Sequence, residues 1–228
     1  MSSAAPAPRQ LVLALDHGES FAREDFLAGP TNETALALIE RWPDWPSSVM
    51  ALVGPEASGK SHLASIWAEI SGARILSASL LSGADVPMAL ATGALVVEDL
   101  AAQDLDERAL FHLLNLAREE SAFVLVTGRA SPASFAVTIP DLGSRLRALP
   151  IVSLAAPDEA LLRALLVKLA ADRQLVLDDA LISFLINRIE RSVAAAREAV
   201  ARLDREAMRL RRPVTRALAA EIFRETAV

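Results

Sequence analysis

Cysteine is absent from the sequence of 228 residues. The chain therefore contains no disulfide, thiolate metal ligand or cysteine nucleophile, and its composition fits a reducing compartment such as the cytoplasm. Aromatic residues are also scarce, at 4%, whereas Ala and Leu are abundant, which favours helices over a β-sandwich. No apolar run reaches the roughly 18 residues needed to span a membrane, and the N-terminus lacks a signal-peptide pattern, so we expect a cytoplasmic protein without membrane contact.

The remaining composition narrows the class further. Hydrophobic residues make up 53% of the chain, so a large core is expected and wholesale disorder is excluded. The net charge of −6 argues against nonspecific DNA binding by the whole surface, although a local basic patch is compatible with it. His17, His62 and His112 are not placed at metal-ligand spacing, so we expect solvated or hydrogen-bonded side chains at all three positions.

Apolar runs and helical patterns alternate between residues 21 and 155. Strands are expected at 49–53, 73–78, 94–97, 122–127 and 151–154. Helices are expected from about 31–32 to a stop before Pro43, from 59–60 to about 70, and over 107–120. The run Val49–Val53 is uninterrupted, as in buried parallel strands. This alternation predicts a parallel sheet with both faces covered by helices.

Only helical patterns follow Pro157. They cover about 158–173, 178–190, 192–211 and 214–225, with Thr215 as a candidate N-cap of the last helix. We therefore predict an α/β fold in which a five-stranded parallel sheet domain (residues 21–155) precedes a small all-α lid domain (residues 156–228). Residues 1–20 are assigned to a flexible N-terminal arm.

A phosphate-binding motif lies between the first predicted strand and the next helix. The stretch Gly54-Pro-Glu-Ala-Ser-Gly59-Lys60-Ser61 matches G-x-x-x-x-G-K-[ST]. Its glycines let backbone amides wrap around phosphate oxygens, Lys60 supplies a cation to the β- and γ-phosphates, and the Ser61 hydroxyl helps to hold Mg²⁺. An incidental glycine turn is the alternative, but the preceding strand and following helix favour an ATP or ADP site.

Two carboxylates end the third predicted strand, as in a Walker B segment. In such a segment the first acid holds Mg²⁺ and the second orients the attacking water. Glu98 stands first, where Asp is usual, and Asp99 stands second. Alternatively, Asp99 holds the metal, and the second position is then Leu100, which cannot act as a catalytic base. A third interpretation is a pair of surface carboxylates without a role in catalysis. Either Walker B register predicts inefficient hydrolysis.

Several stretches, in order, resemble the AAA+ core of the bacterial replication initiator DnaA. They are Glu24–Asn32, the phosphate loop, Phe111–Asn115 and the Ser144–Arg147 stretch, and the resemblance runs from about residue 21 to the C-terminus. DnaA carries a helix-turn-helix domain after its lid, for which this sequence has no counterpart. The chain is therefore similar to the shortened, DnaA-related regulators of the Hda family.

The resemblance implies a set of site residues. For nucleotide binding these are Gly54, Pro55, Ser58, Gly59, Lys60, Ser61, His62, Phe26, Leu27 and Thr127, the last at a sensor-1 position that any strand-end threonine would imitate. Ser61 and Glu98 are implied for the metal, and Asp99 and Arg145 for catalysis. Arg145 corresponds to a finger that enters a neighbour's nucleotide site; without the family comparison, a solvated or salt-bridged arginine is the simpler interpretation.

The Hda-like interpretation also implies partners. Members dock on the DNA polymerase sliding clamp through an N-terminal peptide and trigger hydrolysis of DnaA-bound ATP. Here Gln10-Leu11-Val-Leu13-Ala-Leu15 matches the peptide pattern, since Gln10 can bond at a pocket rim while the leucines fill an apolar cleft. A first core strand would read similarly. A homo-oligomer is also compatible with the sequence.

Two features of the predicted lid leave alternatives open. Ala194 stands where the family has a sensor-2 arginine, with Arg191 and Arg197 one turn to either side. Arg202, Arg205, Arg209 and Arg212 line one helix face, which is a solvated face by default and otherwise an acidic-partner or auxiliary DNA contact. Besides the adaptor, an autonomous ATPase acting as a loader or remodeller and a DNA-anchored scaffold remain as alternative functions.

Overall fold

The computed structural model describes residues 21–223. The predicted clamp-binding peptide Gln10–Leu15 and the end of the last predicted helix lie outside these residues. Among the described residues, no helix combines the length and the apolar character needed to cross a membrane.

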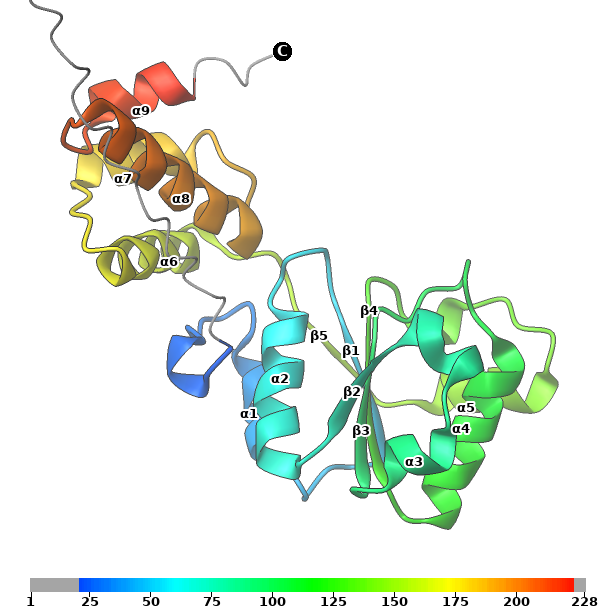
Figure 1. Cartoon of the computed structure of the whole chain (residues 1–228). Coiled ribbons are helices and arrows are strands. Elements are labelled where there is room, and N and C mark those ends of the chain that lie inside the picture. The colour runs from blue at the N-terminus through cyan, green and yellow to red at the C-terminus, as the bar shows by residue number, and fades with distance from the viewer. Residues whose placement is uncertain (1–20, 224–228) are drawn as a thin grey trace, which may run out of the picture.

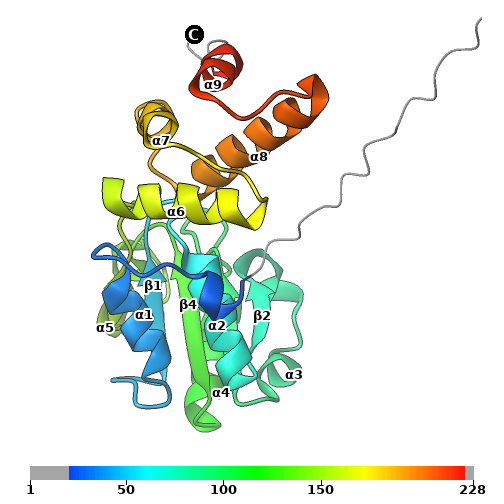
Figure 2. The ribbon, with the colours of Figure 1, turned by 90° about the vertical axis from the view of Figure 1, so that its left-hand side faces the viewer.

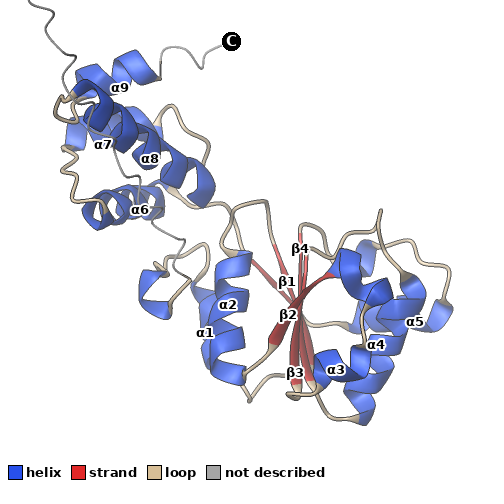
Figure 3. Cartoon of the chain, viewed as in Figure 1, coloured by secondary structure: helices blue, strands red, loops and turns tan. Residues whose placement is uncertain are grey.

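A five-stranded parallel sheet forms the centre of the first part of the chain (Figures 1 and 3). Its strands are β1 (Val49–Val53), β2 (Arg74–Ser77), β3 (Ala94–Glu98), β4 (Phe123–Gly128) and β5 (Ile151–Ser153), in the order β2-β3-β4-β1-β5. Every neighbouring pair is parallel. The predicted α/β fold with five parallel strands is confirmed.

Helices cover both faces of the sheet. On one face, α1 (Glu33–Glu40) and α2 (Lys60–Ser71) enclose a core that contains Trp67, Ile39 and Leu52. On the other face lie α3 (Val86–Leu90), α4 (Glu107–Glu119) and α5 (Pro140–Ala148), whose core contains Leu113 and Leu142. Short 3-10 helices occur at Arg23–Asp25, Ala78–Gly83 and Pro132–Ser134. Alternate side chains of the buried strands enter the two cores, because successive strand residues point to opposite faces.

Four helices after β5 form the part that we call the lid (residues 156–223). They are α6 (Glu159–Asp172), α7 (Asp179–Ile186), α8 (Val193–Leu210) and α9 (Arg216–Ile222), and they share their own apolar core. Each begins at a side chain that accepts a hydrogen bond from its first turn, namely Asp158, Asp178, Ser192 and Thr215. The predicted Thr215 cap is therefore present. Figure 2 shows the lid stacked beyond one end of the sheet.

Two sequence predictions differ from the structure at the level of elements. The helix predicted over 178–190 ends at Ile186, because the chain turns there so that Ser192 can cap α8. Helices α3 and α5 were not predicted. Each is short, with five and nine residues, and each has a proline in its first turn, so neither has a long apolar period of its own.

Candidate functional site

The glycine-rich loop connects β1 directly to α2. The Gly54 amide donates to the Gly128 carbonyl at 3.1 Å, which ties the start of the loop to the end of β4. A Cβ at Gly54 would lie 2.6 Å from the Leu154 carbonyl oxygen, so only glycine fits without a shift. Gly59, which precedes α2, has a φ of 102°, a conformation that side chains rarely adopt. The two motif glycines are thus required by the geometry of the turn.

Four consecutive amides of the loop after Pro55 make no hydrogen bond with the described residues. Within the described residues, no hydrogen bond uses the backbone N–H of Glu56, Ala57, Ser58 or Gly59. Helix α2 begins at Lys60, and the first amides of any helix lack partners within that helix. Consecutive donors at a helix N-terminus form a site for an anion such as a phosphate group.

Lys60 supplies the positive charge of the loop. Its Nζ donates to the carbonyls of Gly54 at 2.9 Å and Pro55 at 2.6 Å, and the residue is only 7% exposed. Desolvation lowers the pKa of Lys60, although the negative charge of Asp99 acts in the opposite direction. The loop carbonyls therefore hold the Lys60 ammonium group inside the turn. A phosphate bound there would contact both this ammonium group and the loop amides.

The two carboxylates at the end of β3, Glu98 and Asp99, lie in different environments. Asp99 is exposed, lines the cavity beside the loop and has a φ of 57°. Its amide donates to the hydroxyl of buried Thr127 at 3.1 Å. Glu98 does not line this cavity, and its Oε1 is buried with no hydrogen-bond partner among the described residues.

This donor set fits a divalent cation only in part. An unpartnered carboxylate oxygen of Glu98 and the cavity-lining Ser61 and Asp99 supply the oxygen chemistry that Mg²⁺ prefers. Within residues 21–223, however, no three His, Asp or Glu side chains gather as a metal-binding group by themselves. A metal here needs phosphate oxygens as additional ligands, as is usual for Mg²⁺ in nucleotide sites.

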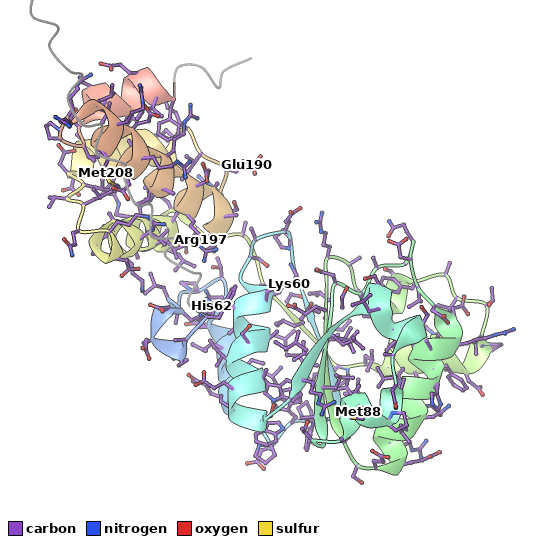
Figure 4. The ribbon with its side chains drawn as sticks, viewed as in Figure 1. Lys60, His62, Met88, Glu190, Arg197 and Met208 are labelled. Atoms are coloured by element: carbon purple, nitrogen blue, oxygen red, sulfur yellow. The ribbon has the colours of Figure 1, made fainter. Side chains whose placement is uncertain are left out.

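A cavity of about 590 Å³ lies between the phosphate loop and the lid. Its loop side includes Glu56–His62, and Figure 4 shows Lys60 and His62 at the end of α2 nearest the lid, with Arg197 at the facing end of α8. The apolar lining includes Phe26, Leu27, Leu161, Leu165, Leu169 and Val193. This volume is typical of small-molecule sites, and one end is apolar while the other is polar.

His62 closes the apolar end together with two phenylalanines. Its ring makes edge contacts with Phe21 and Phe26, at centroid distances of 5.5 Å and 5.2 Å. Its Nε2 lies 2.9 Å from the Ala22 carbonyl, which can only accept, so Nε2 carries the proton. Desolvation lowers the pKa of His62 and favours the neutral ring.

Two contacts fasten the lid to the loop side of the cavity. The Val193 amide, at the start of α8, donates to the carbonyl of Ala57 in the phosphate loop at 3.1 Å. Lys168 of α6 bonds to Asp25 at 2.5 Å and to Asp172 at 3.0 Å. The hydrogen bond that Lys168 donates to Asp25 raises the pKa of Lys168. The loop, the segment before α1 and two lid helices therefore meet around one cavity.

Comparison with solved structures places this arrangement among known folds. The chain is similar to domain III of the Thermotoga maritima replication initiation protein DnaA, with a TM-score of 0.73, 15% identity and coverage of 90% of this chain and 96% of that one. It is also similar to the Thermotoga maritima RuvB Holliday junction branch migration motor, with a TM-score of 0.70, 17% identity and coverage of 90% and 72%. No family model and no curated protein sequence matches the chain.

The chain has the AAA+ fold. A replication initiator DnaA bound to AMPPCP and single-stranded DNA is similar as well, with a TM-score of 0.64, 18% identity and coverage of 82% and 67%.

Two arginines of the lid, Arg191 and Arg197, lie on either side of Ala194, and the structure separates them. Ala194 and Arg197 line the cavity, with Arg197 half-buried. Arg191 is exposed and does not line it. Arg197 is therefore the arginine of this pair that faces the cavity.

Arg145 lies on the sheet part of the chain, away from the cavity lining. It belongs to α5, its guanidinium carbon is 5.1 Å from the centroid of the Phe111 ring, and it does not line the cavity. Gly54, Pro55, Glu98 and Thr127 also lie outside the lining. Pro55 and Gly54 act instead through their carbonyls on Lys60, and Thr127 acts through its bond to Asp99.

The four arginines on one face of α8 and at its end (Arg202, Arg205, Arg209 and Arg212) bond to other residues of the lid. Arg205 pairs with Glu198 at 2.8 Å, Arg209 with Glu206 at 2.7 Å and Arg212 with Glu221 at 3.0 Å. Arg202 donates to the Ile222 carbonyl at 2.8 Å. These contacts are those expected of a solvated helix face, because each arginine already has a partner within the lid.

Sequence reasoning missed several lining residues. Asp25, Lys168 and Arg173 meet at the cavity although 143 positions separate Asp25 from Lys168. Arg129 also lines it, directly after β4. The strand-end position of Arg129 was a usable signal, because the carboxyl ends of parallel strands gather functional side chains. The lid residues carry no comparable local signal.

Proposed function

We propose that the chain binds ADP or ATP in the cavity between phosphate loop and lid. The observation that carries this proposal is Lys60, a buried ammonium group in a glycine turn with four consecutive unpartnered amides, facing an apolar chamber large enough for a nucleoside. Loop amides and Lys60 take the phosphates, and Phe26, Leu27 and His62 surround the base. Ser61 with Glu98 or Asp99 would hold Mg²⁺, which would supply positive charge to neutralise the phosphates.

In this proposal the protein is an Hda-like regulator of chromosome replication in the cytoplasm. Arg145 promotes hydrolysis of ATP bound to DnaA, and Gln10, Leu11, Leu13 and Leu15 dock on the sliding clamp. Support comes from the position of Arg145 on α5, away from the chain's own cavity, where it is available to a second molecule. The fold likeness to DnaA domain III supports a role in replication.

The experiment measures hydrolysis of DnaA-bound ATP with DNA-loaded clamp present. We expect stimulation by the full chain, its loss in Arg145→Ala, and retention in Arg147→Ala, an exposed neighbour on the same helix. Gln10→Ala should lose clamp capture and stimulation together. Equal stimulation by Arg145→Ala and the unmodified chain contradicts the finger role.

An autonomous ATPase, such as a loader acting as a homo-oligomer, is the second candidate. It is favoured by the presence of Lys60, Ser61, Asp99 and Arg197 around one cavity. Turnover of ATP by the purified protein alone discriminates the two. Negligible turnover with tight ADP binding supports the regulator, whereas brisk hydrolysis supports the ATPase.

A further inference from the structure

An ion pair spans the polar end of the cavity. Arg129 Nη2 lies 2.8 Å from Glu56 Oε2, and both residues line the cavity beside Lys60. Their side chains are 69% and 73% exposed, so both reach solvent as well as each other. Glu56 is unusual in its position, because a carboxylate on a phosphate loop repels the phosphate that the loop is built to hold.

The backbone at Arg129 is fixed relative to the loop. Arg129 directly follows Gly128, whose carbonyl accepts from the Gly54 amide and which is paired with Val53 in the sheet. A Cβ at Gly128 would lie 2.8 Å from the Leu100 carbonyl oxygen, so the strand end also packs tightly against the segment after β3. The guanidinium therefore extends from a rigid base at the edge of the phosphate loop.

Glu56 lies on the loop itself. The next residue, Ala57, has a φ of 54°, and its carbonyl accepts from the Val193 amide of the lid. The Glu56 carboxylate thus belongs to the same turn as the four amides, 56–59, that make no hydrogen bond with the described residues. The charges of both Arg129 and Glu56 act on the pKa of Lys60, in opposite directions, so both lie within electrostatic reach of the phosphate-binding ammonium.

The two possible partners of Arg129 differ in strength. An exposed ion pair such as Arg129–Glu56 contributes only about 0–1 kcal/mol, and salt weakens it. A phosphate group carries more charge than a carboxylate and accepts two parallel hydrogen bonds from one guanidinium. A phosphate bound at the loop therefore competes successfully for Arg129.

We propose that Arg129 is a phosphate-binding residue, and that it pairs with Glu56 as long as no phosphate is bound. When the phosphates of a nucleotide enter the loop, the guanidinium leaves Glu56 and contacts the terminal phosphate, and the released carboxylate turns to solvent. The inference rests on the nucleotide site proposed above. Since a triphosphate brings one phosphate and one charge more than a diphosphate, Arg129 favours the triphosphate, and Glu56 weakens binding of both.

Calorimetry on the full chain with Mg²⁺, using ADP and non-hydrolysable AMPPCP, tests the proposal. We expect Arg129→Ala to weaken AMPPCP binding about tenfold, equivalent to about 1.4 kcal/mol, and ADP binding by less. Glu56→Gln should tighten both. Arg129→Lys should recover part of the AMPPCP affinity, because it keeps the charge without the planar fork. The control is Arg118→Ala, an exposed arginine on α4 outside the cavity lining.

The outcomes distinguish the proposed role of Arg129 and Glu56 from nucleotide binding by the phosphate loop. If Arg129→Ala and Glu56→Gln bind both nucleotides as the unmodified chain does, while Lys60→Ala fails to bind, the role of Arg129 is overturned and the nucleotide site stands. If the unmodified chain binds neither nucleotide, the site and the role of Arg129 fail together. Thermal melting checks folding, and both exposed-site variants should melt close to the unmodified chain.

Discussion

At the scale of single residues, Gly54 has no room for a side chain. A methyl group there meets the Leu154 backbone carbonyl at 2.6 Å, and backbone cannot rotate away as a side chain can. We expect Gly54→Ala to lower the free energy of unfolding by about 1–3 kcal/mol, which is the usual cost of overpacking. Thermal unfolding measures the effect.

Gly83→Ala is the matched control for Gly54→Ala. A Cβ at Gly83 meets no atom within 4 Å, so this variant should melt close to the unmodified chain. Equal melting temperatures for both alanine variants would show that the tight approach at Gly54 does not exist in solution.

His62 makes the fold sensitive to mild acid. Desolvation lowers its pKa in the folded chain, so the unfolded chain binds the proton more tightly. The stabilisation is complete above the unfolded pKa of about 6.5 and is lost as the pH falls from there through the lowered folded pKa. We therefore expect the melting temperature to fall between pH 7.5 and pH 5.5.

Substitution isolates the His62 contribution. His62→Gln should flatten this pH dependence, whereas His112→Gln, at an exposed position on α4, should leave it unchanged. An identical slope in the unmodified chain and His62→Gln would assign the acid sensitivity to other groups.

At the scale of elements, one carboxylate fixes the start of the helix that carries Arg145. Glu107 of α4 accepts from the amides of Thr138 and Ile139 at 2.9 Å and from the Thr138 hydroxyl at 2.8 Å. The backbone hydrogen bond from Thr138 lowers the pKa of Glu107, so this support is present above the unfolded pKa and is lost as the pH falls through the lowered one.

We expect Glu107→Ala to speed amide exchange in α5, because its N-terminal anchor is removed. Hydrogen exchange followed by mass spectrometry measures this over residues 136–148. The control Glu119→Ala, at the exposed end of α4, should leave exchange in α5 unchanged. Unaltered exchange in Glu107→Ala contradicts the anchoring role.

Local patterns explain which elements the sequence could predict. The buried strands are continuous apolar runs, and the phosphate loop is one short segment with an obligatory chemistry, so both were predictable. Helix α5 was not, since Pro140 and Gly143 weaken its local pattern and its stability comes from packing of Leu142 and Leu146 against distant residues. The lid side of the cavity depends on contacts such as Asp25–Lys168, which no local pattern encodes.

At the scale of the whole molecule, the lid and the sheet part share the walls of one cavity. The phosphate loop and α8 are bonded directly through Ala57 and Val193, and Asp25 is bonded to α6 through Lys168. A ligand in the cavity therefore contacts both parts at once. ADP at one hundred times its Kd should raise the free energy of unfolding by about 2.7 kcal/mol.

We expect this stabilisation to reach both parts. Amide exchange should slow in the phosphate loop and also at the start of α8 and along α6, because both helices line the cavity. The same concentration of ADP should give no protection in Lys60→Ala. Protection confined to the phosphate loop would mean that the lid does not contact the nucleotide.

We propose that the glycine turn before α2 binds an adenine nucleotide, and titration calorimetry of the full chain with ADP and Mg²⁺ measures this binding. We expect saturable binding at one site per chain and a loss of affinity of about a hundredfold, or about 2.7 kcal/mol, in Lys60→Ala. Absence of binding, or equal affinity in Lys60→Ala, would contradict it.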